Sequence, residues 1–289
     1  MALISGATPL VYDLMRGKDA ISAHHNTYTQ ESPRAPIYDM HYALEFGVLL
    51  SGGMRRLYPD WDCPLGPGHV WFQGAWEPHG YELLTLPVTT LVFGLVPQAF
   101  MAGFAETPPD YDWMAPFVAL PKDRPQVPPG LRREVLNTAL KVTGRLALRK
   151  SPVRLWNTLL LFEMMLLARD DWRPPSRDFA PHPDAHTRIT QAISMVLASS
   201  HAVSVAEAAK ACDMSRNAFS RPFTSAMGLP FAKYCLRHRL SAGAEQLART
   251  DHPIKSIAME WGFADASHFS QCFHKHYGCS PAEYRRRRQ

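Results

Sequence analysis

The chain has 289 residues, of which 46% are hydrophobic, and a formal net charge of +5 at pH 7. Its 5 cysteines are odd in number and show no paired spacing, which argues against a disulfide framework or a zinc knuckle and favours reduced thiols in a cytosol. The opening sequence MALISGATPL has no basic leader, and the longest apolar stretch, LLTLPVTTLVFGLV, is too short and interrupted to cross a bilayer, so we expect neither a secretion signal nor a membrane span.

Residues 37 to 96 have the pattern of short β-strands. Runs such as YALEFGVLL and HVWFQ are rich in β-branched and aromatic side chains, and glycine or proline separates them in SGG and PLGPG. Short strands interrupted in this way are typical of a small β-barrel or sandwich. Four aromatic residues in this region are expected in its core rather than in a ligand cage: Trp61, Trp71, Phe72 and Trp76.

Helical periodicity replaces the strand pattern from about residue 131 to 170. Two segments there, GLRREVLNTALKVTGRLALRK and VRLWNTLLLFEMMLLARD, each have an apolar face. The simplest interpretation is that the apolar side chains of the second segment cover the barrel: Leu155, Leu159, Phe162 and Leu166.

A proline-rich segment, residues 176 to 183, predicts a linker between two domains, residues 1 to 175 and residues 184 to 289. Of the 25 prolines, 21 precede residue 184. Charge divides at the same place, because residues 184 to 289 carry 14 Lys/Arg and 8 Asp/Glu, whereas residues 1 to 183 carry 17 and 18. A net charge of +6 on the second domain against −1 on the first favours a polyanionic partner for the second domain.

Two copies of one pattern follow each other in the second domain. FSRPFTSAMGLPFAKY (219 to 234) and FSQCFHKHYGCSPAEY (269 to 284) share Phe-Ser-x2-Phe-x4-Gly-x5-Tyr in register, and an Ala-rich or apolar stretch precedes each copy. This predicts two helix-turn-helix units. Gly262 and Asp213 stand where the turn of each unit needs a left-handed residue.

The second helix of each unit is expected to begin after a capping residue and to bury two phenylalanines one turn apart: Ser215, Phe219 and Phe223 in one, and Asp265, Phe269 and Phe273 in the other. Pro222 lies inside the first of these helices and has no N–H for the carbonyl of Ala218, which predicts a kink there.

The sequence GFADASHFSQCFHKHYGCSPAEYR (262 to 285) resembles the carboxy-terminal signature of the AraC/XylS family of bacterial transcription regulators, GF-x-D-x-S-x-F-S-x2-F followed by G-x-S-P-x2-YR. The resemblance implies two helix-turn-helix units joined by a long helix, here about residues 231 to 249, whose second helices enter two successive major grooves. It also implies the base-reading residues Asn217, Ser220, Arg221, Ser267, His268 and Gln271. Phosphate contacts are expected from Arg216, Lys275 and Arg285.

The strand region resembles the cupin-type sensory barrel often found at the amino terminus of this family, with LGPGHVWF as its Pro-Gly turn. Asp39, His41 and Glu45 share parity along one expected strand, and with His79 they resemble the cupin metal pattern with Asp39 in place of the first histidine. These four are an acceptable ligand set for Zn, Fe or Mn. The alternative is that they satisfy one another without metal, and because sensory barrels of this family usually lack metal, we expect no cofactor.

The sequence therefore predicts an α+β protein of two domains, a cupin-like barrel with flanking helices and an all-α DNA-binding domain, acting in the cytoplasm at the nucleoid as a transcription regulator and not as an enzyme. Expected partners are double-stranded DNA, a small-molecule effector, a second copy of the chain along the helical pair and, for an activator, RNA polymerase. Two alternatives stay open: a metal-dependent cupin enzyme with a DNA-binding domain attached, and a regulator without an effector.

Overall fold

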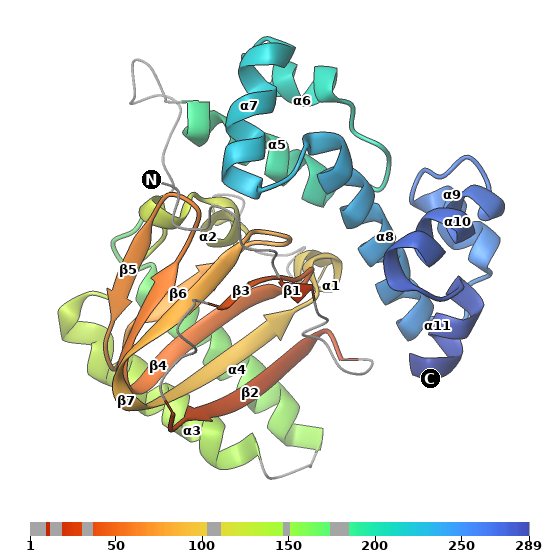
Figure 1. The fold of residues 1–289 in the computed structure, drawn as a ribbon. Coiled ribbons are helices and arrows are strands. Elements are labelled where there is room, and N and C mark those ends of the chain that lie inside the picture. Colours follow the sequence, from red (N-terminus) through yellow and green to blue (C-terminus); the bar gives the residue numbers. More distant parts are fainter. Residues whose placement is uncertain are drawn as a thin grey trace.

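The computed structural model describes residues 10–11, 19–30, 37–102, 111–146, 151–173 and 185–288. Its first half is built around a sheet of seven strands (Figure 1). The strands are β1 (Leu10–Val11), β2 (Ile21–Tyr28), β3 (Ile37–Met40), β4 (Leu44–Leu57), β5 (Asp62–Leu65), β6 (Val70–Gln73) and β7 (His79–Leu95).

The two longest strands, β4 and β7, pair antiparallel at the centre of this sheet. Strand β7 also pairs antiparallel with β2 and β3, and β4 pairs with β5 and β6. Strand β1 runs parallel to β3. The predicted β-domain is thus confirmed as a largely antiparallel sheet, whereas among the described strands no pairing closes the sheet into a barrel. We call residues 19 to 102 the sheet domain.

Strand β4 is buried along its first seven residues, and its side chains enter hydrophobic clusters on both sides of the strand. Phe46 and Val48 lie in the cluster that the helices join, while Leu49 lies in a second cluster on the opposite face. The ring of Trp71 passes so close to Gly47 that an added Cβ would lie 2.0 Å from it. Trp71 is therefore a core residue, as expected, and any larger residue at position 47 would displace it.

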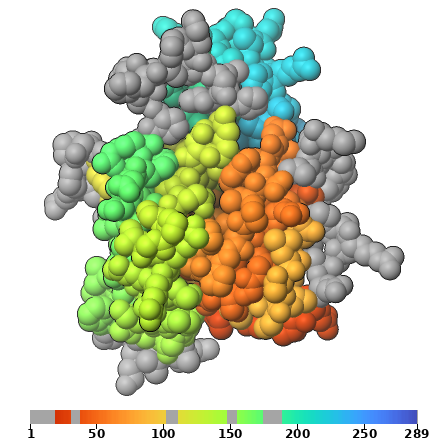
Figure 2. All heavy atoms as spheres, turned by 90° about the vertical axis from the view of Figure 1, so that its left-hand side faces the viewer, coloured from red at the N-terminus to blue at the C-terminus, as the bar shows by residue number. Residues whose placement is uncertain are grey.

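Helices cover one face of the sheet, as Figure 2 shows for the yellow-green segment beside the orange strands. They confirm the predicted helical region of residues 131 to 170. The helical elements of this half of the chain are α1 (Pro97–Ala102), α2 (Ala115–Val118), η1 (Pro121–Asp123), η2 (Pro129–Leu131), α3 (Arg132–Leu146) and α4 (Ser151–Ala168).

The prediction for the packed face of α4 was wrong. Leu155, Leu159 and Leu166 are 65%, 51% and 47% exposed, while Phe162 packs on Trp113 with ring centroids 5.1 Å apart. The side chains that pack against the core lie on a different side of α4, because this helix is apolar nearly all round and its sequence does not fix which face is buried. They are Leu160, Leu161, Met164, Met165 and Ala168.

The second half of the described chain is helical. Its helices are α5 (Ala185–Ala198), α6 (Val205–Ala211), α7 (Arg216–Met227), α8 (Phe231–Arg249), α9 (Ile254–Glu260), α10 (Ala266–Tyr277) and α11 (Pro281–Arg288). Helix α8 has the bounds expected for the connecting helix, and in Figure 1 it leads from α6 and α7 to α9 and α10. We call α6 with α7 the first unit, and α9 with α10 the second unit.

The first unit shares one continuous buried core with the sheet domain and α3, whereas the second unit has a separate core of its own. Helix α8 contributes to both. The predicted linker, residues 176–183, lies outside the described residues, and the exact division into two domains stays a prediction. Among the described residues, no helix combines the length and apolar character needed to cross a membrane.

Helix α8 touches the sheet domain directly. The hydroxyl of Tyr234 donates a 3.3 Å hydrogen bond to the carbonyl oxygen of Ala75, and the guanidinium carbon of Arg237 lies 5.2 Å from the ring centroid of Trp76. His238 is buried beside Tyr42. Burial lowers the pKa of His238 to about 4, so this contact contains a neutral imidazole at neutral pH.

Candidate nucleic-acid interface

The first unit is held by local hydrogen bonds that its sequence specifies. Ser204 and Glu207 form a reciprocal capping box at the start of α6. Asp213 then takes the left-handed conformation, with φ of 51°. The hydroxyl of Ser215 accepts a 3.2 Å hydrogen bond from the backbone N–H of Ala218 and begins α7. The predicted turn and cap are confirmed in this unit.

The second unit repeats this geometry with different residues. Gly262 has φ of 66° at its turn, and an added Cβ would lie 3.1 Å from the Cα of His201. The carboxylate of Asp265 accepts a 2.7 Å hydrogen bond from the backbone N–H of His268 and begins α10. Glycine is therefore favoured at the second turn both by its backbone angle and by the close approach of the backbone at His201.

Aromatic side chains bury the inner face of both second helices, as predicted. The ring centroids of Phe219 and Phe223 lie 5.4 Å apart, and those of Phe269 and Phe273 lie 5.4 Å apart as well. All four side chains are fully buried. Fixing the inner face determines which residues α7 and α10 present to solvent.

The outer faces present all six predicted base-reading residues, and every one of them is exposed. Asn217 and Arg221 lie one turn apart on α7, and Ser267 and Gln271 occupy the same positions on α10. Such amides, hydroxyls and guanidinium groups can donate to or accept from base edges in a major groove. The hydroxyl of Ser220 donates to the carbonyl oxygen of Arg216 at 2.8 Å, which leaves its oxygen as an acceptor.

The predicted phosphate contacts divide into two kinds. Arg216 and Lys275 are exposed at α7 and α10. Arg285 instead donates to the carbonyl oxygens of Leu247 and His252, at 3.3 Å and 2.5 Å. Its guanidinium therefore fastens α11 to the end of α8, a structural role that the sequence pattern did not indicate.

Pro222 does not end α7, which is helical from Arg216 to Met227. The lost N–H leaves the carbonyl of Ala218 without its helical donor. The helix continues past the proline, and the bend expected there stays a prediction.

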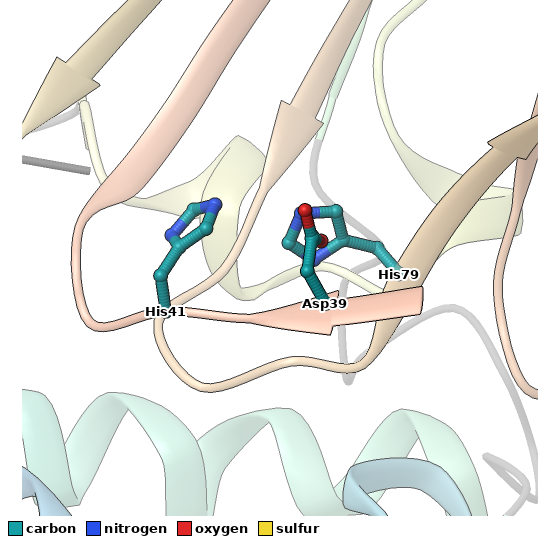
Figure 3. Close-up of side chains that lie close together, drawn as sticks. All are labelled: Asp39, His41 and His79. Carbon is teal, nitrogen blue, oxygen red and sulfur yellow. The ribbon is translucent and has the colours of Figure 1, made fainter. Parts of the chain in front are cut away.

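Three residues of the predicted metal pattern, Asp39, His41 and His79, converge from separate elements, and Glu45 lies beside His41. Asp39 lies in β3, His41 follows that strand, Glu45 lies in β4 and His79 begins β7. The expectation that the first three share one strand was wrong, because the chain turns between Met40 and Leu44. Figure 3 shows the side chains of Asp39, His41 and His79 close together, and one ligand atom from each lies within 4.8 Å of the others.

Close contacts between histidine nitrogens and carboxylate oxygens connect these groups. Nε2 of His79 lies 2.6 Å from Oδ1 of Asp39, and Nε2 of His41 lies 3.3 Å from Oε2 of Glu45. Burial opposes the charged carboxylate of Glu45, yet the hydrogen bond from His41 and the charge of Arg56 hold its pKa well below the usual range. The hydrogen bond to Glu45 likewise raises the pKa of His41 against the effect of burial. The side chains of the cluster thus satisfy one another without a metal, and the donor set is also one that a transition metal accepts.

One arrangement that the sequence did not reveal is a buried ion pair between Arg124 and Glu77. Nη2 of Arg124 lies 2.8 Å and 2.6 Å from the two carboxylate oxygens of Glu77. Arg124 lies in a proline-rich stretch without periodicity, so only the three-dimensional structure brings it to this carboxylate.

Comparison with known proteins places residues 208–287 in a family described as a helix-turn-helix domain. The probable transcriptional regulator LumQ of Photobacterium leiognathi is 35% identical over 82 residues, which cover 28% of this chain and 33% of that protein. The RCS-specific HTH-type transcriptional activator RclR of Escherichia coli (strain K12) is 32% identical over 106 residues, which cover 37% of this chain and 36% of that protein. The chain thus matches about a third of the length of these relatives.

Two solved structures are also similar. An AraC-type transcriptional regulator from Chromobacterium violaceum has a TM-score of 0.34 and 28% identity, covering 35% of this chain and 91% of that one. ToxT from Vibrio cholerae O395 has a TM-score of 0.42 and 13% identity, covering 93% of this chain and 98% of that one.

The matched family and the paired units define a DNA-binding helix-turn-helix domain in the last third of the chain. With the signature of residues 262 to 285, that domain is of the AraC/XylS type, which confirms the resemblance for this part of the sequence.

Proposed function

We propose that the protein is a cytoplasmic, sequence-specific transcription regulator that reads two successive major grooves of DNA with α7 and α10. In this proposal the sheet domain is a cupin-like sensory domain that responds to a small molecule, and the protein itself is not an enzyme. The relatives include a named transcriptional activator, and activation by this chain would involve RNA polymerase.

One observation carries the proposal: two capped helices with equivalent exposed polar faces are attached to the two ends of one helix. Helix α8 has 19 residues, so it is about 28 Å long at 1.5 Å per residue. That length is comparable to one turn of DNA, about 34 Å, the separation of two major-groove sites on one side of the duplex.

Binding of the full-length chain to duplex DNA at several salt concentrations tests this proposal. Each phosphate contact that releases a counterion contributes about −0.9 to the slope of log K against log salt concentration. We expect a steep negative slope, with specific sites bound more tightly than random DNA. Affinity that does not change with salt, or that is equal for all sequences, would count against the proposal.

Gln271→Ala should relax sequence preference more than Arg221→Ala does. In the second unit, α10 contains no proline and the turn residue is Gly262. In the first unit, α7 contains Pro222 and the turn residue is Asp213. Losing a good bidentate base contact costs about 1 to 3 kcal/mol of discrimination. Affinities of the two variants for every single-base change in one mapped operator measure the difference, and a larger loss in Arg221→Ala would contradict it.

We further propose that the exposed face of α4 forms a homodimer with a second copy. Leu155, Trp156 and Leu159 are each more than half exposed, an unusual number of large apolar groups for one helix face. Leu159→Glu should convert a dimer to a monomer in sedimentation equilibrium. Leu84→Glu, at a 43% exposed position on the sheet, is the matched control and should leave the dimer intact. A monomeric wild-type protein would refute the proposal.

A metal-dependent cupin is the second candidate function, and the convergence of Asp39, His41 and His79 is the observation that favours it. A resident metal predicts stoichiometric Zn, Fe or Mn that survives dialysis and disappears in His41→Ala. Elemental analysis after expression in metal-supplemented medium decides between the candidates. Metal-free protein with intact DNA binding would rule out the metal-dependent cupin and leave transcription regulation as the remaining candidate function.

A further inference from the structure

A cavity of about 510 Å³ lies between the sheet domain and the first unit. The sheet domain contributes the loop between β4 and β5, including Tyr58 and Trp61, and the segment from Gly74 to Glu77. The region of α2 and η1 forms another wall. Ile193 of α5 and the last residues of α7, 225 to 227, complete the cavity. This volume is in the range of sites for small organic ligands, about 300 to 1,000 Å³.

The walls of this cavity are mainly apolar and aromatic. Large apolar side chains come from several of these elements: Trp61, Phe117, Leu120, Ile193 and Met227. Trp61 lies against Tyr58 with ring centroids 5.7 Å apart, so the aromatic wall is itself packed.

The charged groups in the cavity leave no net charge for a ligand to neutralise. Arg124 and Glu77 pair with each other, and Arg124 also donates to the carbonyl oxygens of Phe72 and Ala119. Glu77 in turn accepts from Gln73 and from the backbone N–H of Gly74. Asp60 and Lys122, of opposite sign, are exposed at the cavity edge. A charged ligand would therefore lose its hydration without gaining an opposite charge.

The position of the cavity connects it to a DNA-reading helix. Ala226 and Met227 are in the last turn of α7, two turns or less from Arg221. Helix α8 begins three residues after Gly228 and bonds to Ala75 of the opposite wall through Tyr234. A molecule in the cavity would thus contact both the sheet domain and the end of α7.

We propose that this cavity binds an uncharged, mostly apolar small molecule of aromatic character, and that occupancy fixes the placement of α7 relative to the sheet domain. The regulatory part of this inference rests on the proposed function, whereas ligand binding does not. Because occupied and empty states would differ in the placement of one reading helix, the ligand would change operator affinity through the first unit.

Titration of the full-length protein with Nile red, a neutral aromatic dye, tests the site. We expect saturable fluorescence enhancement at one site per chain. Val118→Trp fills the cavity from the α2 wall and should weaken dye binding by at least about tenfold, because a well-filled site cannot hold both groups. Leu84→Trp adds the same side chain at a 43% exposed position on the sheet, outside the cavity, and should leave dye binding unchanged.

Ala226→Phe fills the same cavity from α7 and provides a second variant if Val118→Trp does not fold. Anionic anilinonaphthalene sulfonate should bind less tightly than Nile red. The reverse order of affinities would overturn the inference that the ligand is uncharged. Dye binding that neither filling variant weakens would overturn the site.

Operator affinity separates this inference from the proposed function. Saturating Nile red should change the operator affinity of the wild type and of Leu84→Trp, but not that of Val118→Trp. Specific DNA binding that the dye leaves unchanged would overturn the regulatory inference alone. If the proposed function is wrong, the protein will show no specific DNA binding even when no dye is present.

Discussion

Arg124→Ala should lower the free energy of unfolding by about 3 to 5 kcal/mol, since removing one partner of a buried ion pair leaves the other charge uncompensated. Arg124 and Glu77 are only 6% and 7% exposed. The guanidinium also connects Ala119 to the segment that contains Phe72 and Glu77. Urea denaturation followed by circular dichroism measures the loss.

Arg55 provides the matched control for this prediction. It forms a 2.8 Å ion pair with Glu82, but the two side chains are 40% and 46% exposed. Exposed pairs contribute about 0 to 1 kcal/mol, so Arg55→Ala should have little effect. Equal losses in Arg55→Ala and Arg124→Ala would show that the buried pair has no special role in stability.

Phe269→Ala should lower the free energy of unfolding of the second unit by about 3 to 5 kcal/mol, the usual cost of removing a buried phenylalanine ring. The ring is fully buried, packs on Phe263 and Phe273, and lies so close to Gly243 of α8 that an added Cβ there would be 3.1 Å from it. Without this ring, α10 loses its packing contact with α8, and we expect the protein to lose specific DNA binding as a result.

Met259→Ala is the control in the same unit, because Met259 is 58% exposed on α9. A surface change of this kind usually alters stability by less than about 0.5 kcal/mol. Thermal unfolding and operator binding of both variants provide the comparison. A stable Phe269→Ala protein with unchanged operator affinity would contradict the assigned role of α10.

Local chemistry explains why much of the DNA-binding domain could be predicted from sequence. Caps and left-handed turns depend on one residue and its immediate neighbours, so Ser215, Asp265 and Gly262 could be placed without tertiary information. The two copies of the Phe-Ser-x2-Phe pattern, which lie 50 residues apart, then indicated which face of each helix is apolar. The exposed positions of Asn217 and Gln271 follow from those faces.

Features that depend on tertiary packing could not be predicted in the same way. Helix α4 is apolar on several sides, so its buried face depends on where the sheet and α3 lie. The strand assigned to both Asp39 and Glu45 is interrupted by a turn. The cavity is formed by segments more than 100 residues apart in sequence, such as Trp61 and Met227, and no local pattern relates them.

The placement of α7 and α10 in two successive major grooves is the central claim, and a hydroxyl-radical footprint of the full-length protein on a mapped operator tests it most directly. We predict two protected patches on one face of the duplex, centred roughly 10 base pairs apart, with base changes in both patches reducing affinity. Protection confined to a single groove, or two patches on opposite faces of the duplex, would contradict the claim.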